Sequence, residues 1–171
     1  MRSGGSGRIA NVAAAAIAAA QRAVGQIDAS PLRLAQNLGA LFEEVLWVGA
    51  DPPRGQRARR AADVAGPAGA LRDLASALAA AACDRVLVID AAASPPPELL
   101  LALVAWPEAD VVVLRVDAAA PFPCAVYRRA SALSHARALL AEQHTDVSAL
   151  LEGIGSVTAE IEAPFSTHPP T

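Results

Sequence analysis

The chain has 171 residues, of which 54% are hydrophobic and 18% charged, a balance that excludes an intrinsically disordered protein and suits one globular domain. Its formal net charge of -3 argues against a nucleic-acid-binding protein, because such proteins usually carry a strong basic excess. All 14 basic residues are arginine, so a P-loop lysine, a Schiff-base lysine and a lysine general base are excluded.

The sequence predicts neither a secretion signal nor a membrane partner. The Ala-rich run near the N-terminus lacks the leucines typical of a leader peptide, and no run of about 18 strongly apolar residues occurs. We therefore expect a cytoplasmic protein. The two cysteines, Cys83 and Cys124, are predicted to be small buried hydrophobic residues, because they have no metal-ligand spacing.

The first eight residues are rich in Gly and Ser and are expected to form a flexible N-terminus. Two structures remain open for residues 9–24. Alanine favours a helix, whereas Ile9, Val12 and the alanines that follow could also form a small-residue central strand. Leucines at helical spacing predict a helix over residues 31–42, and a short apolar run predicts a strand over residues 45–48.

A basic loop and a glycine-containing turn follow this strand. The loop at residues 51–60 reads DPPRGQRARR; it could clamp a phosphate, but a solvated loop is the favoured prediction because charge runs usually face solvent. The turn begins at Asp63 and contains Gly66, Pro67 and Gly69. Glycines ahead of a helix can let backbone N–H groups meet an anion, or they can simply form a turn.

The most informative stretch is the continuous apolar run at residues 86–89, which ends on Asp90. Such a run is typical of a strand buried on both faces of a parallel sheet. Because ligands of open α/β sheets bind at the carboxyl ends of strands, Asp90 is the first candidate for chemistry. A carboxylate at this place could hold Mg²⁺ together with phosphate oxygens, or it could merely cap the strand.

The rest of the chain continues the alternation of helices and strands. Helices are predicted at 71–82, 96–105, 130–142 and 145–152, and strands at 109–116, 124–127 and 156–161. This alternation predicts an α/β fold, a Rossmann-like three-layer α/β/α sandwich with a mostly parallel sheet. Residues 9–162 are expected to form this single domain, and residues 163–171 a Pro-rich tail.

The order of these segments resembles the nucleotidyltransferase family typified by molybdenum cofactor guanylyltransferase. The family has a helix starting Pro-Leu, a strand of type EVLVV, a GPLxG turn, a strand ending on a metal-binding Asp, and a PxxAxY segment. The matching segments here are 30–51, 65–90, 96–106, 109–116 and 121–140. The Asp-Ala-Ala at residues 90–92 is also similar to the related sugar-alcohol cytidylyltransferases.

The resemblance implies a nucleotidyltransferase-like fold and Mg²⁺-dependent chemistry. A substrate phosphate would attack the α-phosphate of a nucleoside triphosphate such as GTP, and pyrophosphate would leave. The resemblance assigns the metal to Asp90, the turn near the nucleotide to Gly66, Pro67 and Gly69, and an acidic position ahead of that turn to Asp63.

The family's signature loop, LAGGxSxRMGxDK, is missing from this chain. Counting back from Pro31, the loop should fall near residues 12–22, which read VAAAAIAAAQR. Arg22 stands where the signature lysine would be, and the resemblance makes it the remaining candidate for a catalytic cation. Gly49 and Ala50 also replace a polar residue that often follows the second strand.

These departures predict weakened or absent transferase activity. Alanine adds Cβ atoms where backbone must approach phosphate, and each lost cation removes transition-state stabilisation often worth ~3 kcal/mol. The expected ligand is a small-molecule nucleotide. The alternative is a non-catalytic homologue that acts as a binding or partner protein.

Overall fold

The computed structural model describes residues 7–18, 30–91, 95–106, 109–114, 124–154 and 156–159. Its strands are β1 (Val12–Ile17), β2 (Val45–Val48), β3 (Arg59–Arg60), β4 (Arg85–Asp90), β5 (Val111–Leu114), β6 (Cys124–Arg128) and β7 (Ser156–Ala159). Its helices are α1 (Ser30–Leu41), α2 (Ala70–Ala80), α3 (Pro97–Val104), α4 (Arg129–Ala141) and α5 (Ser148–Gly153). The expected N-terminal segment is described only from Gly7 onward, and the expected Pro-rich tail lies outside the described residues.

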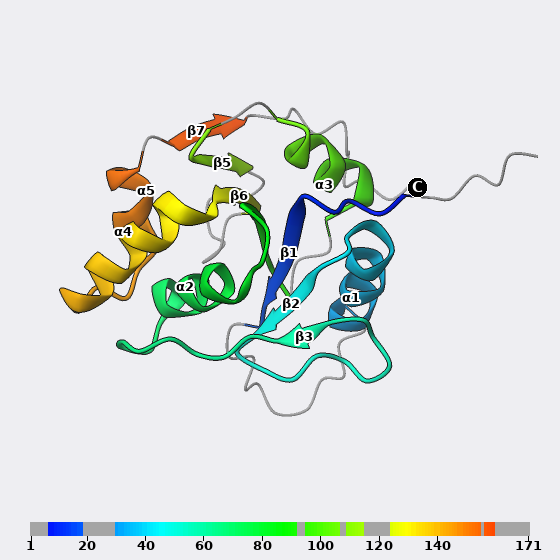
Figure 1. Cartoon of the computed structure of the whole chain (residues 1–171), viewed down its shortest axis with the longest axis horizontal. Coiled ribbons are helices and arrows are strands. Elements are labelled where there is room, and N and C mark those ends of the chain that lie inside the picture. The colour runs from blue at the N-terminus through cyan, green and yellow to red at the C-terminus, as the bar shows by residue number, and fades with distance from the viewer. Residues whose placement is uncertain are drawn as a thin grey trace, which may run out of the picture.

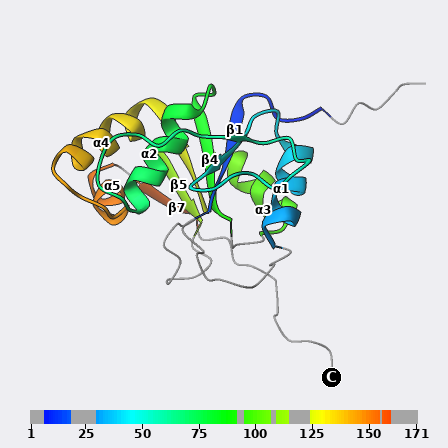
Figure 2. The same cartoon turned by 90° about the horizontal axis from the view of Figure 1, so that it is seen from below.

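The strands form one seven-stranded sheet in the order β3-β2-β1-β4-β6-β5-β7 (Figure 1). β6 runs antiparallel to both of its neighbours, and every other pairing in the sheet is parallel. Helices α1 and α3 cover one face, and α2, α4 and α5 cover the other (Figure 2). The predicted three-layer α/β/α sandwich with a mostly parallel sheet is therefore confirmed.

The Ala-rich segment forms β1, at the centre of the sheet, which decides between the two structures left open by the sequence. All six of its residues are 0% exposed, and it pairs in parallel with β2 on one side and β4 on the other. Two ladders of hydrogen bonds outweigh the helix propensity of alanine, since tertiary context can override intrinsic preference. Its small side chains also let helices from both layers approach the sheet.

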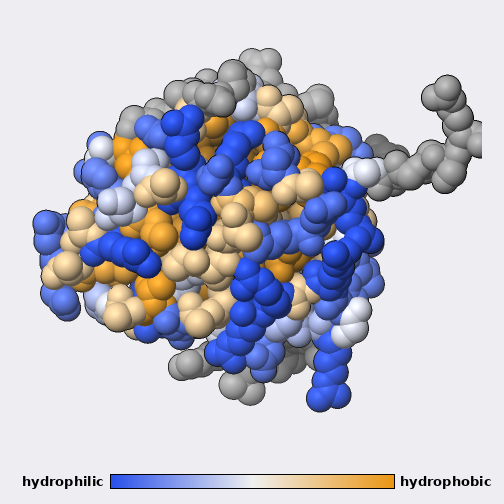
Figure 3. Space-filling model, viewed as in Figure 1, coloured by the Kyte–Doolittle hydropathy of each residue, from blue (hydrophilic) through white to orange (hydrophobic). Residues whose placement is uncertain are grey.

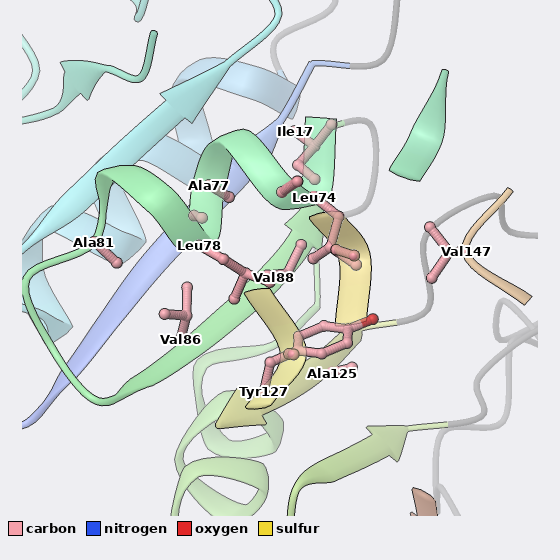
Figure 4. Close-up of a cluster of buried hydrophobic side chains, with 14 of the residues drawn as sticks. Ile17, Leu74, Ala77, Leu78, Ala81, Val86, Val88, Ala125, Tyr127 and Val147 are labelled. Atoms are coloured by element: carbon pink, nitrogen blue, oxygen red, sulfur yellow. The ribbon is translucent and has the colours of Figure 1, made fainter. Parts of the chain in front are cut away.

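Alternate residues of β1 face two separate cores. Ala13, Ala15 and Ile17 lie in the core beneath α2, α4 and α5. Figure 4 shows Leu74 of this core near the ring of Tyr127. The other core, beneath α1 and α3, contains the opposite face of β1, the Trp47 side chain and the leucines Leu34, Leu38, Leu100 and Leu103.

Two local predictions need correction. Arg59 and Arg60 belong to the short edge strand β3 and are not part of a loop. The last helix starts at Ser148, three residues later than expected, because the Asp146 carboxylate accepts the backbone N–H of Ser148 at 3.0 Å. Hydrogen bonding from Ser148 lowers the pKa of Asp146. Among the described helices, none is both long and apolar enough to cross a membrane.

Candidate functional site

The centre of the sheet's carboxyl edge is the natural binding position in this fold. From β1 the chain passes to β2 and β3 on one side, and then returns to β4 on the other side of β1. Ligands of open α/β sheets bind at such a reversal of strand order. The candidate site is therefore the carboxyl ends of β1 and β4.

Hydrogen bonds hold the strand ends together at this reversal. Ile17 pairs with Val48 of β2 and with Asp90 of β4. The Ala18 N–H donates to the Val48 carbonyl at 2.9 Å, and the Ala91 N–H donates to the Ile17 carbonyl at 2.9 Å. The exits of β1, β2 and β4 are thereby fixed side by side.

Asp90 is the carboxylate at this reversal. The four residues before it, 86–89, are fully buried, whereas Asp90 itself is only partly buried at the end of β4. The strand thus anchors the backbone while the side chain stands at the edge. This is the position that sequence reasoning gave to Asp90.

Gly49 is a site residue whose role sequence reasoning missed. Its φ is +84°, and a Cβ atom there would lie 2.7 Å from the Ala18 carbonyl oxygen. The glycine therefore lets the exit of β2 approach the exit of β1 closely. A glycine directly after a buried strand was the only signal of this contact in the sequence.

The expected signature segment is placed differently by the structure. Residues 12–17 form β1 itself, so this part of the expected alignment is wrong. The segment between β1 and α1 consists of residues 18–29, of which only Ala18 is described. Arg22 belongs to that segment and lies outside the described residues.

The turn that contains Gly66, Pro67 and Gly69 lies against the segment that follows α4. Gly66 has φ +141° and faces the Leu140 side chain, and a Cβ atom on Gly69 would lie 2.8 Å from the Thr145 carbonyl oxygen. That oxygen also accepts the Leu71 N–H at 3.0 Å. One of the first N–H groups of α2 is therefore already bonded to protein, which leaves fewer for an anion.

Asp63 is exposed ahead of this turn, and together with burial its negative charge raises the pKa of a second carboxylate, Asp73. Burial raises the pKa of Asp73; the Arg72 guanidinium opposes the rise and the Asp63 charge adds to it. The Arg72–Asp73 ion pair is long, at 3.9 Å. These charges lie on the first turn of α2 and on the segment before it.

The basic loop divides between two edges of the sheet. Arg59 binds Glu44 at 2.7 Å and the Ala80 carbonyl, next to the start of β2 and the end of α2. Arg60 pairs with Asp51 at 2.9 Å, beyond the end of β2. Because Arg59 lies at the amino end of β2, these arginines do not form a single phosphate clamp, in agreement with the favoured prediction.

Glu44 is the best-bonded carboxylate of this region. It accepts the Arg59 guanidinium at 2.7 Å and the Ala82 N–H at 2.9 Å. Burial alone would raise the pKa of Glu44, but the hydrogen bonds from Ala82 and Arg59 outweigh it and lower the pKa below the ordinary 4.5. Glu44 thus joins β3, the start of β2 and the end of α2.

We expect Glu44→Gln to destabilise the protein near neutral pH, because the variant loses the ion pair with Arg59. The loss should be only about 1 kcal/mol, since Arg59 is exposed and solvent partly screens the pair. The pKa of Glu44 is lower in the folded protein than in the unfolded chain, so Glu44 of the unfolded chain takes up its proton first as the pH falls. The contribution is therefore complete above 4.5 and is lost as the pH falls below that value. Urea unfolding of both proteins at about pH 7 and pH 3.5 measures this difference. Glu43→Gln, at the exposed neighbour, is the control; an equal loss in both variants would contradict the assignment.

The described residues offer Mg²⁺ a limited set of ligands. Among them, no three His, Cys, Asp or Glu side chains group closely enough to hold a metal ion alone. Cys83 and Cys124 are partly rather than fully buried; burial raises the pKa of both thiols, that of Cys124 to about 12. A single carboxylate still fits Mg²⁺ bound to a nucleotide, since this ion commonly takes one or two carboxylates plus phosphate oxygens.

Comparison with known proteins identifies the fold. No protein-family model matches the chain, and no curated protein matches it. The solved structure of an Aquifex aeolicus VF5 protein, Aq1419, is 18% identical, covers 89% of this chain and 87% of its own, and has a TM-score of 0.69. The 2-C-methyl-D-erythritol 4-phosphate cytidylyltransferase of Thermus thermophilus is 21% identical, with 91% and 92% covered and a TM-score of 0.63. The 4-diphosphocytidyl-2C-methyl-D-erythritol synthase of Anaerococcus prevotii DSM 20548 is 14% identical, with 87% and 86% covered and a TM-score of 0.63.

At these identities the comparisons establish the fold alone. Two of the three similar structures are named as a cytidylyltransferase and as the synthase of a diphosphocytidyl compound, and each is covered over most of its length. The chain therefore has a nucleotidyltransferase-like fold. A fold does not fix an activity, because function depends on the groups at the site.

Proposed function

We propose that this protein binds a nucleoside triphosphate with Mg²⁺ at the carboxyl edge between β1 and β4, and that it is a nucleotidyltransferase of weakened activity. The observation that carries the proposal is Asp90, a carboxylate at the end of β4 whose backbone neighbour is Ile17, the last residue of β1. This is the topological switch point of a nucleotidyltransferase-like sheet.

The chain's own groups would divide the work as follows. Asp90 would hold the metal, which when bound neutralises charge on the phosphate oxygens. Arg22, on the segment after β1, would contribute the cation for the triphosphate. In the reaction an acceptor phosphate oxygen forms a bond to the α-phosphorus, the bond to the β-phosphate oxygen breaks, and pyrophosphate leaves. Residues 18–22 read AAAQR and contain no glycine or lysine, so weak stabilisation of the developing charge is expected.

Two bases are the first choices for the nucleotide. The resemblance to molybdenum cofactor guanylyltransferase favours GTP, and the Asp-Ala-Ala at residues 90–92 favours CTP. The names of the similar structures also favour CTP and a sugar-alcohol phosphate as the acceptor. Calorimetric titration with CTP, GTP and ATP, each with Mg²⁺ and then with a chelator, tests the proposal. Saturable heat with one nucleotide that the chelator abolishes supports it, and no heat from folded protein contradicts it.

Replacing Asp90 with asparagine is expected to weaken Mg²⁺-dependent nucleotide binding at least about tenfold, because an amide does not neutralise the metal charge. Asp84→Asn is the matched control, since Asp84 directly precedes β4 at the opposite end of the same strand. The control should bind as tightly as the original protein. If Asp90→Asn binds equally well while thermal unfolding shows it to be intact, Asp90 is not the metal ligand.

The second candidate is a non-catalytic homologue that acts on a protein partner. The observation in its favour is the turn at Gly66 and Gly69, which faces Leu140 and Thr145 and is followed by the Leu71 N–H that donates to Thr145. A turn packed in this way serves structure more than phosphate binding. Absence of nucleotide binding in the titration would favour this candidate.

A further inference from the structure

The outer surface of the α1 and α3 layer exposes large hydrophobic side chains beside the polar Arg33 and Gln36 of α1. The large hydrophobic side chains exposed among the described residues are Leu32 at 42%, Leu101 at 41% and Trp106 at 36%. Leu32 lies on α1, Leu101 lies on α3, and Trp106 directly follows α3. All three therefore belong to the same layer of the sandwich (Figure 2).

Helix α3 is apolar after its first turn, including the part of its outer face that follows Glu98. Residues 99–106 read LLLALVAW, and the exposed positions among them are Leu101, Ala102, Ala105 and Trp106. Figure 3 shows hydrophobic residues at the surface over α3. A helix that is apolar all round is normally covered by protein or lipid, so this face is expected to be covered by something.

The opposite layer is an internal comparison. Helix α4 and the residues after it expose an ordinary polar set that includes His135, Arg137, Glu142 and Asp146. The exposed large hydrophobic side chains among the described residues are therefore a property of the α1 and α3 layer, whereas alanines are exposed in both layers.

The charges of the α1 and α3 layer are few and opposite. In all of α1 and α3 the only charged residues are Arg33 and Glu98, both exposed. Each lies in the first turn of its helix. Both helices start at the carboxyl edge of the sheet, because α1 connects the parallel strands β1 and β2, and α3 connects β4 to β5, which runs in the same direction. Neither side chain forms an ion pair with another described residue.

We propose that two copies of this chain associate through this face as a symmetric dimer. A two-fold axis parallel to the helices would set α1 of one copy against α3 of the other, with first turns at the same level. Arg33 would then face Glu98 of the second copy twice, around an apolar centre of Leu32 and Leu101. A surface with one positive and one negative group on neighbouring helices is complementary to itself after this rotation, as an isologous interface requires, and an apolar centre poor in charge is typical of homodimers.

The size of the face sets the expected affinity. The helices have 12 and 8 residues, which makes them about 18 and 12 Å long at 1.5 Å per residue. The outer surface of two such helices side by side is small compared with the roughly 800 Å² that each partner buries in a standard interface. We therefore expect a dissociation constant in the micromolar range.

Sedimentation velocity of the full chain from about 1 to 300 µM tests the proposal. The original protein should shift from monomer to dimer across this range. Ala102→Asp, on the outer face of α3, should weaken association at least about tenfold by placing an unpaired charge in the interface. Ala138→Asp, at an exposed alanine of α4 in the opposite layer, is the matched control and should associate as the original does.

Charge exchange tests the symmetry itself. Arg33→Glu and Glu98→Arg should each weaken association about fivefold, because each places like charges opposite one another. The protein with both changes should recover to within about twofold of the original. A monomer at every concentration, an Ala102→Asp variant that dimerises as tightly as the original, or a double variant weaker than either single one would overturn the proposal, and the face would then belong to another segment of the chain or to a different partner.

Discussion

Gly49→Ala is expected to destabilise the protein by about 3 kcal/mol or more, through backbone strain and a steric clash acting together. At φ +84° an alanine is strained, and its Cβ atom would lie 2.7 Å from the Ala18 carbonyl oxygen. The obstacle is main chain, held by the hydrogen bond from the Ala18 N–H to the Val48 carbonyl. Relief of the clash therefore requires the exits of β1 and β2 to move apart.

Gly55→Ala separates the two effects. Gly55 has a similar φ of +75°, but a Cβ atom there meets nothing within 4 Å. We expect this variant to lose only the strain contribution, about 1–2 kcal/mol. The difference between the variants in urea unfolding then measures the contact with Ala18. Equal losses would show that Gly49 is kept for its dihedral angle alone.

The Gly49 variant should also affect the proposed site. Ala18 is the first residue of the segment that contains Arg22, so a shift of Ala18 displaces the start of that segment. We expect any nucleotide affinity found by calorimetry to fall in Gly49→Ala and to remain in Gly55→Ala. A site residue can thus be a glycine that contacts no ligand and acts only by letting two strand ends meet.

Apolar runs were sufficient to predict most of the elements and one site position. The run at residues 86–89 predicted a doubly buried strand and, with it, the place of Asp90 at the strand's end. Helical spacing predicted α1 within one residue at each end. Of the residues on the predicted apolar face, Leu38 is buried but Leu32 is 42% exposed, and Leu34 is buried in its place. These features depend on local pattern, which one sequence contains in full.

Contacts between distant segments could not be predicted in this way. The all-alanine part of β1 favours a helix by local propensity, and only its pairing with β2 and β4 makes it a strand. The same limit misplaced the signature segment, because the count back from Pro31 took residues 12–17 as loop. The contact of Gly69 with Thr145 joins positions far apart in sequence, and no local pattern marks it.

An alanine of β1 lies beside the largest side chain of β2, and a double replacement can test whether the small and large side chains fit each other. Ala16 pairs directly with Trp47 on β2, both side chains lie in the core under α1 and α3, and Trp47 is 2% exposed. The large ring therefore packs beside the smallest chiral side chain.

We expect Trp47→Leu to cost about 2–4 kcal/mol by leaving a cavity and Ala16→Leu to cost about 1–3 kcal/mol by overpacking. In the double variant the added leucine occupies part of the space that the ring leaves. Its loss should fall short of the sum of the single losses by about 1–2 kcal/mol.

Ala13→Leu combined with Trp47→Leu is the control, because Ala13 faces the opposite core. This pair should be additive within about 0.5 kcal/mol. Urea unfolding of the original, the three single and the two double variants gives both coupling energies. If Ala16 and Trp47 prove as additive as the control pair, the alanines of β1 are required for the approach of the helices rather than for the fit to Trp47. The two explanations differ in what limits the size of the β1 side chains. In the fit to Trp47 the limit is the neighbouring strand β2, whereas in the approach of the helices it is a covering helix.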